Sequence, residues 1–308
     1  MSMWCRTVCG MLLVALYLGG TGEIEAKEVV VLLDPNIRPY VEALAGFKEA
    51  SDASIKVFER REDGDISDEQ ALIPGIRARR PDQILVIGGE ALAALAGKIT
   101  DIPILFSMVL SPHDKLKQHY ENLTGVAMNV SPERQMKTLD SLMPSVRHVG
   151  VVYAPEESGS LIKLGEAALT KHNIEMDAQS ALSEKEAEHY LEMVMDRNQA
   201  YWMVPDHFMR SKDLVRYLFF ASQENNKALI GLSDKYVRAG ALFAFTVQNR
   251  SLGRQAGELS NRIMNGVKPG SIPIEMARDV DFSINMKVAK ALGIQVPGEL
   301  LQAAKHVY

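Results

Sequence analysis

Residues 122–160 read NLTGVAMNVSPERQMKTLDSLMPSVRHVGVVYAPEESGS, and this stretch decides how the rest of the chain is interpreted. Its opening apolar run predicts a short strand that ends at about Ala127. Ser131-Pro132 predicts a helix start, because serine is a favoured N-cap and proline at the first helical position loses no hydrogen bond. Apolar residues recur at helical spacing from Met136 to Met143, so this helix has one apolar face until Pro144 stops it.

The second half of the stretch predicts a strand and a polar loop. His148–Tyr153 indicates a strand buried on both faces, because its valines leave little polar alternation. The loop that follows, residues 154–160, is small, polar and acidic, and it leads into another helix. The stretch is therefore a strand–helix–strand unit with a loop at the carboxyl end of a strand, which is where open α/β sheets bind ligands.

The chain before this stretch alternates between short apolar runs and amphipathic segments. Four runs predict strands, at Val29–Leu33, Ile55–Phe58, Ile84–Ile87 and Ile104–Phe106. The segments between them predict helices, apart from a charged turn at Arg60–Asp68. Right-handed crossovers would place these helices on both faces of a parallel sheet.

The chain after the stretch continues in the same rhythm. Strands are predicted around Ile174, at Tyr201–Val204, at Ala228–Ile230 and, as the last one, at Leu242–Phe245. Helices are predicted at about 157–172, 184–197 and 214–222. The two halves therefore predict an α/β protein made of two Rossmann-like lobes with parallel sheets.

Residues 248–264 predict one more helix, and its position decides how the lobes are joined. Gly253 and Gly257 stand four residues apart, which predicts a close approach of this helix to its sheet. Residues 272–275 then look extended. If the helix packs on the first lobe, the chain crosses between lobes three times and forms a hinge. Lobe one is then residues 27–126 plus about 247–272, and lobe two is residues 127–246 plus about 273–308.

Residues 1–26 have the features of a cleavable signal peptide for export. Arg6 precedes an apolar core at residues 11–18, and Ala26 marks the expected cleavage point. The core is far shorter than the roughly 20 residues of a spanning helix, so we expect no direct membrane anchor. Cys5 and Cys9 precede the core, whereas a lipid-anchored protein has its cysteine at the cleavage point. The mature chain then lacks cysteine, which excludes disulfides and thiolate nucleophiles, and we expect it in a periplasm.

The composition argues against nucleic acid as a partner and against a catalytic centre. A formal net charge of −5 leaves no basic stripe for phosphates. The seven histidines show no zinc-ligand spacing, and no phosphate loop, dinucleotide fingerprint or Gly-x-Ser-x-Gly elbow is present. We therefore expect no enzyme activity, no cofactor and no metal. The adjacent pair Asp206 and His207 keeps a hydrolase open as an alternative.

Several motifs resemble those of a known family. They are ILVIGG at 84–89, IPILFS at 102–107, NLTGV at 122–126, RHVGVVY at 147–153, VKP at 267–269, IPIE at 272–275 and AKALGI at 289–294. Their order and spacing resemble the substrate-binding proteins of ABC transporters, of the type that binds tryptophan or tyrosine. The resemblance implies the type I periplasmic binding protein fold, a small-molecule ligand and an ABC permease in the inner membrane as partner. We also expect a monomer.

The resemblance further implies a ligand closed between the lobes, with contacts at the carboxyl ends of the strands. Carried over position by position, the contact residues are Gly89, Glu90, Phe106, Ser107, Met108, Tyr153, Ser158, Gly159, Ser160, Asp206, Ser233, Asp234, Phe245 and Gln248.

The chemistry of these residues leaves alternatives open. The N–H groups of residues 158–160 could receive a carboxylate, or the segment could merely cap its helix. Asp206 or Asp234 could receive an ammonium group, or cap a helix. The aromatic rings could line the ligand or belong to the core.

The functional expectation is a periplasmic protein that captures a small solute for import. An aromatic amino acid, another amino acid or an unrelated small molecule would all fit as ligand. A ligand-sensing subunit that presents its closed form to a membrane receptor is the alternative of another class.

Overall fold

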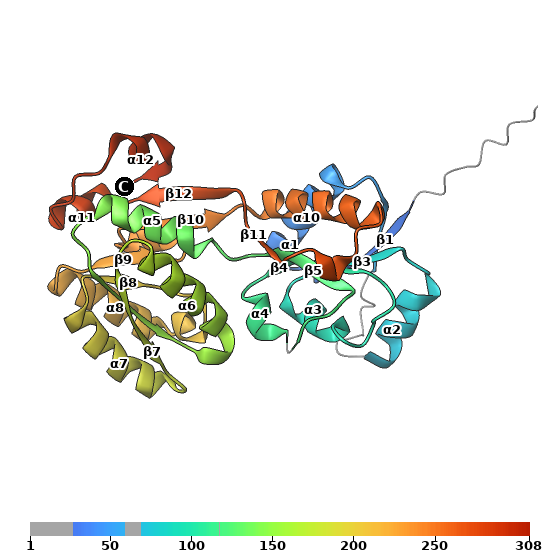
Figure 1. Cartoon of the computed structure of the whole chain (residues 1–308), viewed down its shortest axis with the longest axis horizontal. Helices are drawn as coiled ribbons and strands as arrows, with labels where there is room; N and C mark the ends of the chain where they lie inside the picture. The colour runs from blue at the N-terminus through green and yellow to red at the C-terminus, as the bar shows by residue number, and fades with distance from the viewer. Residues whose placement is uncertain (1–26, 59–68, 117) are drawn as a thin grey trace, which may run out of the picture.

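Two β-sheets form two lobes that lie side by side along the long axis of the molecule (Figure 1). The computed structural model describes residues 27–58, 69–116 and 118–308. The expected signal peptide and the whole of the charged turn at 60–68 lie outside the described residues. The α/β architecture with two mostly parallel sheets is confirmed.

The sheet of lobe one has the strand order β11-β5-β4-β3-β1-β2, and its neighbours pair in parallel. Its strands are β1 Glu28–Leu32, β2 Ser54–Val57, β3 Gln83–Ile87, β4 Ile104–Val109, β5 Leu123–Ala127 and β11 Glu275–Met276. Its helices are α1 Arg38–Ala50, α2 Glu69–Ala78, α3 Gly89–Leu95, α4 Pro112–Lys115 and α10 Asn249–Met264, with the short 3₁₀ helix η2 at Pro269–Ser271. Strands β3, β4 and β5 are buried along their whole length, because helices cover both faces.

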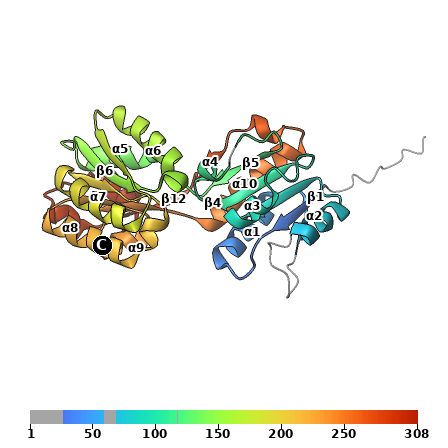
Figure 2. The same ribbon diagram turned by 90° about the horizontal axis from the view of Figure 1, so that it is seen from below.

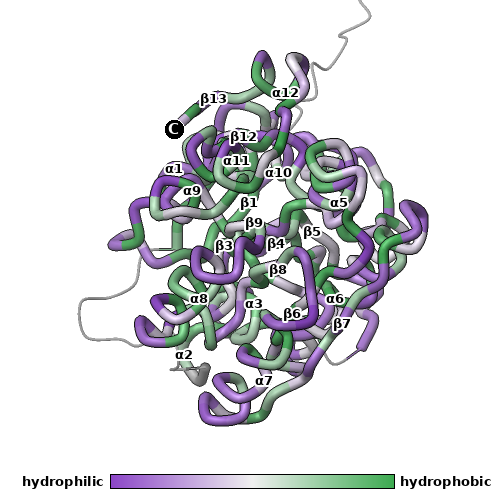
Figure 3. Tube along the Cα trace, turned by 90° about the vertical axis from the view of Figure 1, so that its left-hand side faces the viewer, coloured by the Kyte–Doolittle hydropathy of each residue, from purple (hydrophilic) through white to green (hydrophobic). Residues whose placement is uncertain are grey.

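The sheet of lobe two has the order β13-β12-β10-β9-β8-β6-β7. Its strands are β6 His148–Tyr153, β7 Glu175–Ser180, β8 Ala200–Trp202, β9 Ala228–Gly231, β10 Phe243–Val247, β12 Val280–Ile284 and β13 Ala304–Val307. Its helices are α5 Pro132–Leu142, α6 Pro155–Thr170, α7 Glu184–Arg197, α8 Lys212–Glu224, α9 Asp234–Ala239, α11 Met286–Ala291 and α12 Gly298–Ala303, with the 3₁₀ helix η1 at His207–Arg210. Figure 2 shows α5 and α6 on one face of the sheet and α7 and α8 on the other, and Figure 3 shows apolar and hydrophilic segments alternating along the chain.

The expectation that Leu242–Phe245 is the last strand is wrong. Strand β12 pairs antiparallel with β10, and β13 then pairs in parallel with β12. Strand β12 does carry a period-2 alternation of apolar and polar residues, which is a strand signal, whereas β13 is largely exposed and carries no such pattern. Strand β13 is at the edge of this sheet, and it takes its partner β12 from the tertiary structure and not from a continuous apolar run.

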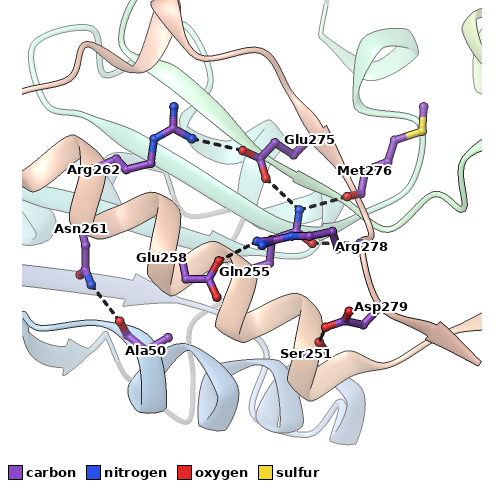
Figure 4. A network of polar contacts seen from close by, with 10 residues as sticks. All are labelled: Ala50, Ser251, Gln255, Glu258, Asn261, Arg262, Glu275, Met276, Arg278 and Asp279. Atoms are coloured by element: carbon purple, nitrogen blue, oxygen red, sulfur yellow. Dashed lines mark hydrogen bonds and ion pairs between the residues drawn. The ribbon is translucent and has the colours of Figure 1, made fainter.

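The chain passes between the lobes three times, after β5, after β10 and after β11. The third passage comes later than the expected position at about residue 273, because β11 at Glu275–Met276 still pairs with β5 of lobe one. Side chains of α10 hold this strand (Figure 4). Gln255 Nε2 donates to the carbonyl oxygen of Met276 at 3.0 Å, and Arg278 donates to the Glu258 carboxylate at 2.6 Å.

The close helix approach predicted from Gly253 and Gly257 exists, but its main partner is α1 and not the sheet. A Cβ on Gly253 would stand 1.8 Å from the carbonyl oxygen of Ala43, and one on Gly257 would stand 2.9 Å from that of Phe47. Gly46 of α1 faces Arg250 of α10 just as closely, at 1.8 Å. Only glycine lets two helix backbones touch in this way. In the part of the chain that the structure describes, no helix is long and apolar enough to cross a membrane.

Candidate functional site

A cavity of about 390 Å³ lies between the lobes, at the carboxyl ends of β8, β9 and β10. We call it the cleft cavity. Its lining residues are Pro39, Leu110, Met128, Asn129, Val130, Gln135, Leu161, Trp202, Met203, Pro205, Gly231, Leu232, Ser233, Phe245, Thr246, Val247 and Asn249. They come from both lobes, and most are apolar with a few amide and hydroxyl groups. Volume and lining are those of a small-molecule site.

Aromatic side chains form the wall of the cleft cavity on the side of lobe two. The indole of Trp202 is 1% exposed, and its Nε1–H donates to Gln135 Oε1 at 2.9 Å. Helix α6 can lie against this ring because residue 165 is glycine, where a Cβ would stand 2.4 Å from the indole. Phe245 is partly exposed and lies 5.1 Å from Phe282, centroid to centroid. These contacts hold the wall in place before any ligand arrives.

A second cavity, of about 900 Å³, lies outward from the cleft cavity, and we call it the outer cavity. Loops after β1 and β3 line it on lobe one, and Arg210 reaches it from lobe two. Its charges are mixed, with Asp34 and Glu90 near Lys115. Burial raises the pKa of the Tyr40 phenol, and the carboxylates of Glu90 and Asp34 raise it further.

Asp206 is 5% exposed, and both of its carboxylate oxygens are occupied by backbone N–H groups. Oδ2 accepts from Ala154 at 2.8 Å and Oδ1 accepts from Phe208 at 3.1 Å. The carboxylate therefore joins the loop after β6 to the loop after β8, and it caps η1. Of the two roles left open for Asp206, the structure shows the structural one.

Burial raises the pKa of Asp206 to about 6, although the hydrogen bonds from Ala154 and Phe208 act in the opposite direction. Between its ordinary pKa of 3.8 and about 6, the folded chain holds a proton that the unfolded chain has lost. The stabilising contribution of this group is therefore complete below the unfolded pKa and is lost as the pH rises through about 6. A shift of about two pKa units corresponds to about 3 kcal/mol of unfolding free energy.

Urea unfolding of the wild type and of Asp206→Asn tests this pH dependence. Asparagine does not titrate, so the unfolding free energy of the wild type minus that of the variant should fall by about 2.4 kcal/mol from about pH 4 to about pH 7, because part of the effect is already lost at pH 4. Other titrating groups are common to both proteins and cancel in the difference. A difference that stays constant over this range would contradict the raised pKa.

The ring of His207 does not use Asp206 as its partner. Its Nδ1 lies 2.8 Å from Glu157 Oε1, and its ring lies against the tilted ring of Phe208, at 4.1 Å between centroids and 47° between planes. Since the oxygens of Asp206 bind backbone groups, the two residues do not form the acid–base pair on which the hydrolase alternative depended.

Residues 158–160 lie where the lobes touch. The backbone N–H of Ser160 donates to Asp114 Oδ1 at 2.8 Å, and Ser158 is fully buried. This segment of α6 does receive a carboxylate, but the carboxylate belongs to α4 of the same chain.

Asp234 and Gln248 are bound by neighbours within the protein. The Asp234 carboxylate accepts from the hydroxyls of Ser283 and Tyr308, each at 2.8 Å. Burial alone would raise the pKa of Asp234, but these hydrogen bonds outweigh it and lower the pKa. Its own N–H donates to the hydroxyl of Thr246, a residue of the cleft cavity, at 2.8 Å. Gln248, the residue just before α10, donates to the carboxylate of Asp281 in β12.

The predicted contact residues therefore do not form one site. Ser233 and Phe245 line the cleft cavity, Gly89 and Glu90 line the outer cavity, and Ser160 borders a small gap between α4 and α6. Phe106, Ser107 and Met108 are buried in lobe one, each at most 3% exposed, and Tyr153 packs on the core of lobe two. Gly159 follows Ser158 at the lobe contact.

Sequence reasoning missed much of the cleft lining, including Met128, Gln135, Trp202 and Met203. Trp202 and Met203 stand in the predicted strand 201–204, where their hydrophobicity indicates only a core position. The available signal is their place at the carboxyl end of that strand. Among the described residues, no three His, Cys, Asp or Glu side chains gather closely enough to hold a metal ion.

Comparisons with known proteins agree with this geometry. Residues 42–308 match the family model of the ABC transporter substrate binding protein. The "Tyrosine-binding protein" of Clostridioides difficile (strain R20291) is 22% identical over 272 residues, which cover 85% of this chain and 78% of that protein.

Two solved structures share the fold. A ligand-free, open substrate binding protein with adhesive properties from Clostridium difficile has a TM-score of 0.67 at 19% identity, covering 92% of this chain and 99% of that one. An ABC domain in complex with L-Trp from Streptococcus pneumonia has a TM-score of 0.61 at 20% identity, covering 91% and 99%. The two-lobed fold is that of type I periplasmic binding proteins, and because the family model spans most of its length, the chain belongs to the ABC transporter substrate-binding protein family.

Proposed function

We propose that this protein captures a small molecule in the cleft cavity and delivers it to an ABC permease for import, without catalysing a reaction. It would do so in the periplasm, as a monomer without a membrane anchor, after removal of residues 1–26. The observation that carries the proposal is the cleft cavity, whose lining comes from both lobes. A ligand that contacts both lobes stabilises the closed arrangement of the lobes, so ligand binding and closure are coupled.

We propose an aromatic amino acid as the first candidate ligand. The wall of Trp202 and Phe245 suits a planar apolar group, and Asn129, Thr246 and Asn249 supply polar atoms for its other end. One similar protein is a tyrosine-binding protein and one similar structure holds L-Trp, which supports this class.

Thermal unfolding of the purified protein with L-tyrosine, L-tryptophan, L-phenylalanine and a panel of other metabolites tests the proposal. A ligand at a thousand times its Kd adds about 4 kcal/mol to the unfolding free energy, which raises the Tm by several degrees. The ligand should be recovered unchanged after long incubation, because no reaction is expected. If aromatic amino acids leave the Tm unchanged while another solute raises it, the ligand class is wrong but capture stands. No shift with any solute would argue against capture.

Phe245→Ala is expected to weaken binding of the ligand found in this way by 10- to 100-fold, or about 1.4 to 2.8 kcal/mol. The ring borders the cleft cavity, so its loss removes a contact surface. Phe220→Ala is the matched control, because this ring is 62% exposed on α8. Isothermal titration calorimetry gives both affinities. Equal Kd values for the two variants would place the ligand elsewhere.

A further inference from the structure

The one-turn helix α4 is built onto the hinge. It follows β4 directly, and its preceding residue Ser111 has the left-handed φ of 45°. The N–H of Ser111 donates to Asn129 Oδ1 at 2.7 Å, and Asn129 lies in the first passage between the lobes, 4% exposed. Because a buried amide holds the base of α4 to the hinge strand, α4 keeps a defined direction relative to it.

From this base, Asp114 reaches across to lobe two. Its Oδ1 accepts the backbone N–H of Ser160 in the second turn of α6 at 2.8 Å. Figures 1 and 2 both show α4 next to α6, although the two helices belong to different sheets. This is a hydrogen bond between the lobes that does not run through the three connecting segments.

Apolar contacts surround the hydrogen bond. Pro112 of α4 and Met276 of β11 face Leu161 and Leu164 of α6 across a gap of about 30 Å³, roughly the volume of one water molecule. Leu161 also lines the cleft cavity. A change in the angle between α4 and α6 therefore moves a residue of the ligand site.

The contact also has unused hydrogen-bonding capacity. Asp114 Oδ2 and Ser158 Oγ are both buried, and neither has a partner among the described residues. One is an acceptor and the other can donate, and Ser158 stands two residues before Ser160 on α6.

We propose that Asp114 is a positioning residue for the ligand cleft. Its carboxylate holds α4 against α6 and restrains the angle at which the lobes face each other, so that ligand affinity depends on it without direct contact. The consequence for affinity rests on the proposed function, whereas the restraint on the lobes does not.

Pulsed EPR distances in the ligand-free full chain test the restraint. Spin labels would be placed at Lys56→Cys on β2 and Glu188→Cys on α7, both exposed and in different lobes, after Cys5 and Cys9 are changed to serine. Asp114→Ala should broaden and shift the distance distribution. Asp114→Asn should keep the wild-type distribution, because its amide oxygen can still accept from Ser160. Asp213→Ala, an exposed aspartate paired only with Arg216 in the described contacts, is the control.

Circular dichroism checks that each variant is folded. If Asp114→Ala does not fold, Asp114→Ser replaces it in the distance measurement. A purely structural role would lower the melting temperature but leave the distances of the folded protein unchanged. If the distributions of Asp114→Ala and Asp213→Ala coincide, Asp114 does not restrain the lobes and the proposal is wrong.

Calorimetry with L-tyrosine and L-tryptophan then tests the consequence for the cleft. Because apparent affinity falls with the fraction of molecules in the binding-competent arrangement, Asp114→Ala should bind about three- to tenfold more weakly. Asp114→Asn should stay within about twofold of the wild type, because its amide oxygen still accepts from Ser160 and the binding-competent fraction is kept. Unchanged affinity in Asp114→Ala would overturn the link to the cleft. If the wild type binds neither amino acid, the proposed ligand fails, while the EPR result still decides the restraint.

Discussion

Gly253→Ala is expected to lower the free energy of unfolding by about 3 kcal/mol or more. The new Cβ would stand 1.8 Å from the carbonyl oxygen of Ala43 and 2.7 Å from its carbonyl carbon. Both atoms belong to the backbone of α1, so no side-chain rotation relieves the clash and the whole helix must move. The better helix propensity of alanine, worth about 1 kcal/mol, is too small to compensate. Urea unfolding followed by circular dichroism measures the change.

Gly298→Ala is the matched control for this substitution. No atom lies within 4 Å of its Cβ position at the start of α12, so its stability should stay within about 0.5 kcal/mol of the wild type or rise slightly. If Gly253→Ala behaves like Gly298→Ala, then α1 and α10 are farther apart than described. Because α10 also binds the segment around β11, separation from α1 should disturb the hinge as well.

Trp202→Ala is expected to destabilise lobe two by about 3 to 5 kcal/mol and to abolish measurable ligand binding. The indole fills the space between α6 and the sheet, so its removal leaves a large cavity against Gly165. It also removes the donor to Gln135 Oε1. Thermal or urea unfolding gives the stability, and calorimetry with the ligand found for the wild type gives the loss of binding.

Trp202→Phe separates the two contributions of this residue. The phenyl ring keeps most of the apolar packing but leaves Gln135 without its donor, so the expected loss is about 1 to 3 kcal/mol. Its affinity should lie between those of the wild type and Trp202→Ala. If both variants are as stable as the wild type, Trp202 does not support the wall of the cleft cavity.

Much of the fold was predictable because buried parallel strands have a strong local pattern. Continuous runs such as Val149–Val152 have few alternatives to a strand covered on both faces. Ser131-Pro132 likewise marked the start of α5. The C-terminal strands β12 and β13 lack a continuous apolar run, and their partners come from the tertiary structure: β12 pairs with β10, and β13 pairs with β12.

The candidate site was less predictable than the fold. Phe245 and Ser233 were expected in the cleft because the family resemblance implies ligand contacts at strand ends, and they line it. The same rule placed Phe106 and Asp206 there, but Phe106 is fully buried in lobe one and Asp206 binds backbone groups. A strand end locates the edge of a sheet, but it does not determine whether a side chain faces the ligand or the interior.

The sequence by itself determined the alternation of strands and helices, the division into two lobes and the close glycine contact of the helix at 249–264. These features depend on side-chain periodicity and on the small size of single glycines. Both can be read from the order of residues along the chain. Only the tertiary structure decided that α10 lies against α1, that β11 stays in lobe one and that Asp114 meets Ser160. Such contacts join residues 46 to about 200 positions apart, and no local pattern specifies the partner of a hydrogen-bonding group at that separation.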